Sequence, residues 1–149
     1  MKRLIRPQKK SRGRRTPENS REHKVLLSVR SLFPQDPYIY QGYYSWLKSV
    51  VDEPLQIDIF FTKVGALGER ALAIEVQGDQ HRGKWRRAVK RFFKTEDAFE
   101  RQIHNDIRKK ELLLRKGVLF IELWPEESIE PEALQEKIEK VAGVSINAK

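Results

Sequence analysis

The stretch ALAIEVQGDQHR, residues 71–82, begins like a buried β-strand and ends in polar residues. Its small and β-branched apolar side chains favour a strand, yet Glu75 lies in the middle of the run. A buried carboxylate without a partner costs several kcal/mol. The stretch therefore predicts a strand in which Glu75 has a cation, a proton or a functional reason to be there.

A second carboxylate lies in the preceding apolar run, LQIDIFFT, residues 55–62, which contains Asp58. The two runs are joined by a glycine-containing loop, which predicts an antiparallel hairpin. Alternate residues of a strand share a face, so Glu75 and Gln77 point the same way. If the two strands pair, Asp58 and Glu75 lie side by side on one face.

Two neighbouring carboxylates in an apolar sheet repel each other unless a positive charge lies between them. A hard divalent cation is the most economical solution. Mg²⁺ binds oxygen ligands, keeps several waters and is usually held by one or two carboxylates together with substrate phosphates. We therefore expect Mg²⁺ as the cofactor, with Mn²⁺ able to substitute.

The rest of the chain predicts an α/β fold with elements in the order α-β-β-β-α-β-α. Periodicity and breakers place a helix at about 18–33, ended by prolines, and an aromatic strand at 38–47 that either bends at Gly42 or gives way to a loop there. The remaining elements are a helical region over about 85–116 with a possible break near Thr95, a strand at 118–124 and a helix at about 131–142. We expect a small mixed sheet of about four strands flanked by helices.

The long helical region has two further features. Gly117 is expected to end it as the first residue beyond the helix. One stripe of the helix is predicted to face the core, formed by Phe99, Ile103, Ile107 and Leu114.

Composition limits the class of protein. At 149 residues the chain is long enough for one compact domain, which we expect over residues 17–149. It has no cysteine, which removes disulfides, thiolate zinc sites and a Cys nucleophile. No run of 18 apolar residues and no secretory signal is visible, so we expect a cytoplasmic protein with no membrane partner.

The net charge of +9 is concentrated near the N-terminus. Residues 1–15 contain eight Lys or Arg and no acid, which leaves 22 basic and 21 acidic residues in the remainder. Such a block repels itself and buries little apolar surface, so residues 1–16 are predicted to form a disordered arm that binds a polyanion. A solubilising tail or a targeting signal is the alternative.

A second basic block, RGKWRRAVKRFFK at 82–94, has seven Lys or Arg and no acid, interleaved with aromatic residues. This composition favours contact with nucleic acid, although a solvated helix face with its aromatics in the core gives the same pattern. The side chains predicted to contact DNA phosphates are Arg12, Arg14, Arg15, Lys84, Arg86, Arg87, Lys90 and Arg91.

The ordered set of elements and acids resembles the PD-(D/E)XK nucleases. Asp58, followed by Glu75-Val76-Gln77 and preceded by a helix that bears Glu22, matches their core order of helices and strands. IEVQGDQH is similar to the Ile-Glu-Val-Asp-Gly-x-x-His signature of the branch related to very-short-patch-repair endonucleases and to phage and intron-borne nucleases.

In that branch the next helix carries characteristic residues, whose spacings are occupied here by Asp106, Lys109, Leu113 and Gly117. The resemblance covers about residues 20–124 and depends on the ordered set of motifs rather than on any one of them.

The resemblance implies a restriction-endonuclease-like core and a Mg²⁺-dependent DNA endonuclease, most similar to homing, repair-nicking or junction-resolving enzymes. Its expected substrate is double-stranded DNA, and a homodimer and a phage or bacterial origin are compatible with it. By hypothesis, the Asp58 and Glu75 carboxylates and the Val76 carbonyl bind the metal.

Four other residues have expected catalytic roles. Glu22 would orient a water or a second metal, and His81 would transfer a proton. Gln77 would hold a water or a phosphate oxygen through its polar head. Lys109 or Lys110 would supply the positive charge that Gln77 lacks.

Two residues depart from the family pattern. Gln77 is neither the Lys of the general family nor the Asp of the closer branch, and Glu122 stands where that branch usually has Arg. These departures favour the alternative function, a basic nucleic-acid-binding module with an inactive nuclease site.

Ordinary structural roles also remain open for the individual residues. Asp58 could cap a hairpin turn, and Glu75 could pair with an Arg of the basic block. Glu22 could be a surface acid near the helix N-terminus, in which case Glu18 competes with it for the site role. His81 could be an ordinary loop histidine.

Overall fold

The computed structural model describes residues 20–78 and 95–146 of the chain. Its elements, in chain order, are α1 (Arg21–Leu32), β1 (Tyr38–Lys48), β2 (Pro54–Val64), the 3₁₀ helix η1 (Gly65–Leu67), β3 (Arg70–Val76), α3 (Glu96–Arg115), β4 (Leu119–Leu123) and α4 (Pro131–Ala142). The predicted order of helices and strands is confirmed.

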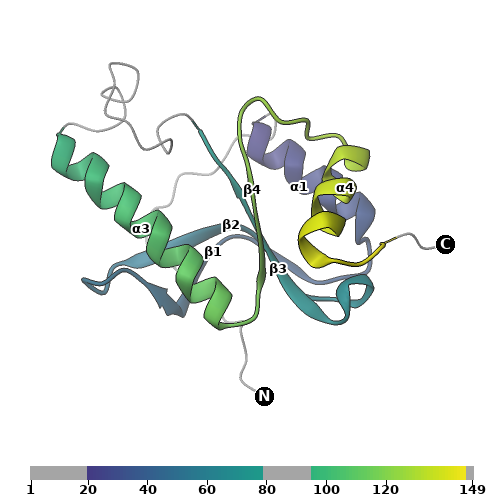
Figure 1. Ribbon diagram of the computed structural model, residues 1–149, viewed down its shortest axis with the longest axis horizontal. Helices are drawn as coiled ribbons and strands as arrows, with labels where there is room; N and C mark the ends of the chain where they lie inside the picture. Colours follow the sequence, from purple (N-terminus) through teal and green to yellow (C-terminus); the bar gives the residue numbers. More distant parts are fainter. Residues whose placement is uncertain (1–19, 79–94, 147–149) are drawn as a thin grey trace.

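The four strands form one mixed sheet in the order β1-β2-β3-β4. β1 pairs with β2 and β2 with β3 in antiparallel fashion, whereas β3 and β4 are parallel. A parallel pair requires a crossover connection, and α3 lies in it. Figure 1 shows α3 on one side of the sheet and the α1–α4 pair on the other. The predicted mixed sheet flanked by helices is therefore present.

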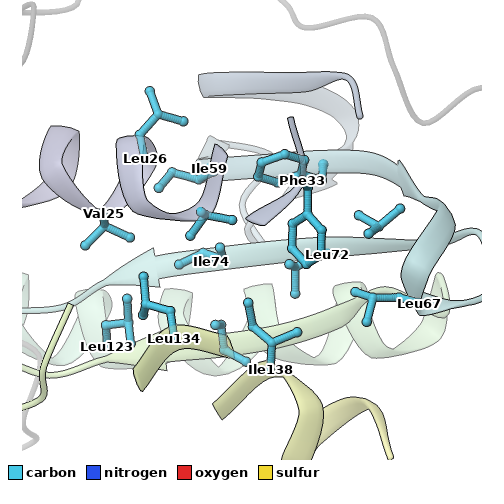
Figure 2. Close-up of a cluster of buried hydrophobic side chains, with 14 of the residues drawn as sticks. Val25, Leu26, Phe33, Ile59, Leu67, Leu72, Ile74, Leu123, Leu134 and Ile138 are labelled. Atoms are coloured by element: carbon cyan, nitrogen blue, oxygen red, sulfur yellow. The ribbon is translucent and has the colours of Figure 1, made fainter. Parts of the chain in front are cut away.

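The larger hydrophobic core lies between the sheet and the α1–α4 pair (Figure 2). The strands contribute alternate residues to it, including Ile59 from β2, Ile74 from β3 and Leu123 from β4, all fully buried. Leu134 and Ile138 of α4 complete this layer. Burial of this apolar surface is the main stabilising contribution to the fold.

A second, smaller core lies on the α3 side of the sheet. It joins Tyr44 and Leu47 of β1 and Phe60 of β2 to Leu113 near the end of α3. This end of α3 packs on the sheet through apolar contacts, whereas the middle of the helix presents several polar residues toward the strands.

Local sequence explains where the helices begin and end. Ser20 caps α1 by accepting a hydrogen bond from the His23 N–H, and Thr95 caps α3 by accepting one from the Ala98 N–H. Gly117 follows α3 with φ 73°, a conformation that glycine adopts without steric cost. The predicted role of Gly117 is confirmed, and the expected break near Thr95 corresponds to the start of α3.

Of the two alternatives at Gly42, the loop is excluded. β1 continues through Gly42, because the missing side chain admits Tyr44, whose Oη would lie 2.6 Å from a Cβ at this position. The predicted stripe of α3 is correct at Phe99, which is buried, and wrong at Ile107 and Leu114, which are 52% and 77% exposed. The face of α3 that meets the sheet is largely polar, so apolar periodicity could not identify it.

Several predicted features lie outside the described residues: the arm at 1–16, the first part of the long helical region at 85–94, His81 and the eight proposed DNA-contacting basic residues. No helix in the described ranges is both long and apolar enough to cross a membrane.

Candidate active site

The register of the β2–β3 hairpin brings the two predicted carboxylates together. Ile59 pairs with Ile74, which places Asp58 directly opposite Glu75. The Asp58 N–H donates to Glu75 Oε2 at 2.9 Å, and the Val76 N–H donates to Asp58 Oδ2 at 2.9 Å. Each carboxylate thus bonds the backbone of the opposite strand, which fixes both side chains on the α3 side of the sheet.

Lys109 on α3 provides the positive charge at this pair. Its Nζ lies 2.8 Å from Glu75 Oε1, and the two side chains are only 12% and 7% exposed. Glu75 therefore pairs with a lysine of α3 rather than with an arginine. Of the two lysines considered from the sequence, Lys109 reaches the carboxylates.

Asp58 lacks such a partner. Within the described part of the chain, no Lys or Arg forms an ion pair with it and no group donates to its Oδ1. Burial raises the pKa of Asp58 well above its usual range, and repulsion from Glu75 and Glu22 raises it further against the opposing effect of Lys109. The site therefore contains a carboxylate that is costly to ionise unless more positive charge arrives.

The Glu75–Lys109 pair is nearly inaccessible to water. Burial raises the pKa of Glu75, while Lys109 and the Asp58 N–H act in the opposite direction. Burial alone would lower the pKa of Lys109, but the carboxylates of Glu75, Asp58 and Asp106 outweigh it, so the pKa of Lys109 is raised. The ammonium group stays charged at neutral pH.

Gln77 and Glu122, the two residues that differ from the motifs of the nucleases that the sequence resembles, contact each other. Gln77 Nε2 donates to Glu122 Oε2 at 2.9 Å, and Lys110 Nζ lies 3.1 Å from Glu122 Oε1. β3 and β4 are in register at Glu75 and Glu122, so the Lys109–Glu75 and Lys110–Glu122 pairs are neighbours. Successive lysines of α3 thus bind the acids of two adjacent strands.

α3 contributes further polar residues that the sequence prediction did not include in the site. Gln102 Nε2 donates to Asp106 Oδ1 at 2.8 Å, and both residues share a helix face with Lys109 and Leu113. The spacing 102, 106, 109, 113 is the sequence signal for this face, because residues three and four apart are neighbours on a helix. The family resemblance supplied Asp106, Lys109 and Leu113 of this face without a site role for Asp106, and Gln102 was missed because only apolar residues were used to orient the helix.

Glu22 approaches the same place from α1, as predicted. It lies in the first turn of α1 and accepts a hydrogen bond from Gln41 Nε2. Its charge contributes to the raised pKa of Asp58. Glu22 is thus a third carboxylate at the site. It is held by Gln41 of β1, whose backbone has a left-handed φ of 55°.

These residues line an open cleft of about 400 Å³ between the β1–β2 strands and α3. Asp58, Glu75 and Gln77 lie along it with Lys109 and Glu22. The other lining residues, most of them polar, are Tyr43, Pro54, Leu55, Gln56, Val76, Gln102, Asn105 and Asp106. A 400 Å³ cleft lies within the range of ordinary ligand sites.

The donor set fits a hard cation that needs few protein ligands. In the described ranges, no three Asp, Glu or His side chains converge closely enough to hold a metal by themselves. Mg²⁺, however, is commonly held by one or two carboxylates with the remaining positions filled by water and substrate oxygens. Asp58, with Oδ1 unbonded by the described residues and the cleft beside it, is suited to that arrangement.

Comparisons of this chain with protein-family models, with curated proteins and with solved structures found no match. The geometry of the cleft is therefore the basis for a functional assignment.

Proposed function

We propose that the protein is a Mg²⁺-dependent DNA endonuclease that hydrolyses phosphodiester bonds. The observation that carries this proposal is Asp58, a half-buried carboxylate with no ion pair among the described residues, directly opposite Glu75 at an open cleft. Burying a charge without compensation is costly, so such a residue is explained best by a cation that binds there in function.

Asp58 and Glu75 would hold the metal, with the Val76 carbonyl as the third candidate ligand. Bound Mg²⁺ would polarise the scissile phosphodiester and lower the pKa of the attacking water. The chain itself contributes the fixed positions of the two carboxylates, each anchored to the backbone of the other strand. Preorganised groups of this kind need little rearrangement during reaction.

Lys109 has the role of stabilising charge that develops on the phosphate oxygens. Its ammonium is buried beside Glu75, lines the cleft and remains protonated because the surrounding carboxylates raise its pKa. Fixed positive charge placed where negative charge develops is a strong source of transition-state stabilisation. Glu22 would orient water at the opposite side of the cleft.

The charge distribution supports a polyanionic substrate. The described residues contain 14 Lys and Arg against 19 Asp and Glu, whereas residues 1–19 and 79–94 together contain 15 against 2. Phosphate affinity would therefore come from these two basic segments, and the acidic cleft would supply the chemistry. The substrate would be double-stranded DNA, cleaved in homing, in nicking during repair or in resolving junctions, by a monomer or a homodimer.

The proposal is tested by incubating the protein with supercoiled plasmid and Mg²⁺ or Mn²⁺, with and without EDTA. We expect conversion to nicked or linear DNA that EDTA stops and that Glu75→Gln abolishes. Glu132→Gln is the matched control, because Glu132 is an exposed acid of α4 on the other side of the sheet. Cleavage that persists with EDTA or in Glu75→Gln would refute the proposed site.

One observation favours the alternative, a nucleic-acid-binding module without activity. Both carboxylate oxygens of Glu75 already have protein partners, so the site is partly satisfied without a metal. Calorimetry with Mn²⁺ separates the two functions. Binding that Asp58→Asn removes supports the nuclease, whereas DNA binding without any metal binding supports the alternative.

A further inference from the structure

Gln77 has a side-chain amide whose orientation bears on the proposed function, on which the inference below rests. An amide has two different ends, an NH₂ donor and a carbonyl acceptor, and its hydrogen-bond partners decide which end points where. The Glu122 carboxylate forms an ion pair with Lys110, and a carboxylate only accepts hydrogen bonds. The contact of 2.9 Å between Gln77 Nε2 and Glu122 Oε2 therefore fixes the donor end on Glu122.

The carbonyl end of Gln77 is left for the cleft. Gln77 lines the cleft and Glu122 does not, so the two ends of the amide serve different surroundings. No group of the described residues donates to Gln77 Oε1, while the backbone N–H of Gln77 bonds the Leu123 carbonyl and holds the residue against β4. A carbonyl oxygen can accept a hydrogen bond from water, but it cannot donate one to a phosphate oxygen.

Glu122 is itself held by Lys110, whose Nζ lies 3.1 Å from its second carboxylate oxygen. With one oxygen on Lys110 and the other on Gln77, Glu122 has little freedom to rotate. The neighbouring Lys109–Glu75 pair anchors the same turn of α3 to β3. The amide of Gln77 is thus set by a row of contacts that runs from α3 through β4.

We propose that Gln77 Oε1 accepts a hydrogen bond from the water that attacks the phosphodiester, and that Glu122 is a positioning residue that keeps this oxygen toward the cleft. In this role Gln77 orients the attacking water and takes no proton from it, because a neutral amide is a very weak base. The proton leaves to solvent or to another group of the site.

The arrangement predicts that replacing the hydrogen-bond acceptor at residue 122 with a donor turns the Gln77 side-chain amide around. In Glu122→Arg the guanidinium can only donate, so it would bond Gln77 Oε1 and turn the NH₂ end toward the cleft. The double variant Gln77→Glu/Glu122→Arg would restore an acceptor, because one oxygen of the new carboxylate pairs with the guanidinium and the other faces the cleft. Gln77→Met removes the acceptor at similar volume.

The test measures single-turnover cleavage rates for these three variants. DNA affinity in EDTA and the melting temperature serve as readouts that do not depend on metal-supported activity. We expect Gln77→Met and Glu122→Arg each to slow cleavage about tenfold, the effect of one lost orienting hydrogen bond. DNA affinity should stay within about twofold, and the double variant should recover most of the rate.

The outcomes separate this inference from the proposed function. An inactive wild type overturns both. An active wild type with an equally active Glu122→Arg, or a double variant no faster than Glu122→Arg, overturns only the orientation of Gln77. If Glu122→Arg does not fold, Gln77→Met decides: a normal rate refutes the inference, as does a slower rate that merely follows a lower melting temperature.

Discussion

The two faces of the sheet differ although the same strands build both. Toward α1 and α4, alternate residues such as Ile59, Ile74 and Leu123 form a continuous apolar layer. On the other face, β2 and β3 present Phe60 and Ala73 and, two residues along each strand, Asp58 and Glu75. The face toward α1 and α4 is therefore an apolar layer. The face toward α3 changes from apolar to charged side chains between residues two positions apart on each strand.

This difference shows which parts of the sequence serve folding and which do not. The apolar face gains stability from burial in proportion to its area. The ionic part of the α3 face loses the hydration of several charges and regains only part of it through the Glu75–Lys109 pair. A fold with one complete core can retain a costly polar cluster on its other face, which is typical of a functional site.

The largest expected effect lies on the apolar face. Ile74→Ala removes a fully buried side chain from the layer against α1 and α4, and we expect it to lower the free energy of unfolding by about 3–4 kcal/mol. Urea unfolding followed by circular dichroism measures this loss. A loss below about 1 kcal/mol would mean that this face is not the main source of stability.

The next effect lies in the ionic cluster. Lys109→Met leaves the Glu75 carboxylate buried without its partner, and we expect a loss of about 3 kcal/mol. Adding Glu75→Gln removes the uncompensated charge, so the double variant should regain most of that stability. It should nevertheless not cleave DNA, because both groups of the proposed site are gone.

Melting curves of the wild type, the single variants and the double variant at pH 7 test this expectation. A double variant as unstable as Lys109→Met would show that packing of the lysine stem, and not the charge, dominates its contribution.

The apolar face was the more predictable of the two. The runs at 55–62 and 71–78 contain alternating apolar residues with a turn between them, and each of these signals depends on local structure alone. The positions of Asp58 and Glu75 followed from the same alternation, because a hairpin in this register puts them opposite each other. Strand alternation therefore predicted the centre of the site as well as the core.

The α3 side of the site could not be obtained in the same way. The contacts of Lys109 with Glu75 and of Gln77 with Glu122 join residues 34 and 45 positions apart, across a crossover helix. The first contact depends on how α3 packs on the sheet, and the second depends on the parallel pairing of β3 with β4. The apolar stripe predicted for α3 was only partly correct, since Phe99 is buried but Ile107 and Leu114 are exposed while Asp106 and Lys109 line the cleft.

A smaller effect of opposite sign, a gain in stability, is expected when Asp58 is replaced. The pKa of Asp58 is higher in the folded protein than in the unfolded chain, so folding takes up protons at this carboxyl. The contribution of Asp58 therefore lowers the free energy of unfolding as the pH rises from the ordinary pKa of 3.8 through the folded-state pKa. Asp58→Asn keeps an oxygen that can accept from the Val76 N–H but carries no charge. We expect it to gain about 1 kcal/mol of stability at pH 7 and to lose cleavage.

The pH dependence distinguishes this explanation from a simple packing effect. The stability difference between Asp58→Asn and the wild type should be small near pH 3 and should grow as pH rises through the window above the ordinary pKa. Denaturant unfolding at a series of pH values in metal-free buffer measures it. A difference that does not change with pH would show that the charge of Asp58 costs the fold nothing.

The smallest expected effect on the folded domain comes from removing residues 1–15. This block contains eight of the 30 Lys and Arg residues, and it precedes the described domain, so its deletion should leave the melting temperature nearly unchanged. It should weaken DNA binding and make the dependence of log Kobs on log salt concentration shallower, because each lost phosphate contact reduces that slope by about 0.9.

Replacing the eight basic residues of this block with Gln at full length is the matched control, since it separates charge from chain length. Equal slopes for the deletion and the wild type would assign phosphate binding to the 82–94 block instead, whose basic residues directly follow the strand that carries Glu75. The ionic face of the sheet would then depend on a single neighbouring basic segment for its substrate.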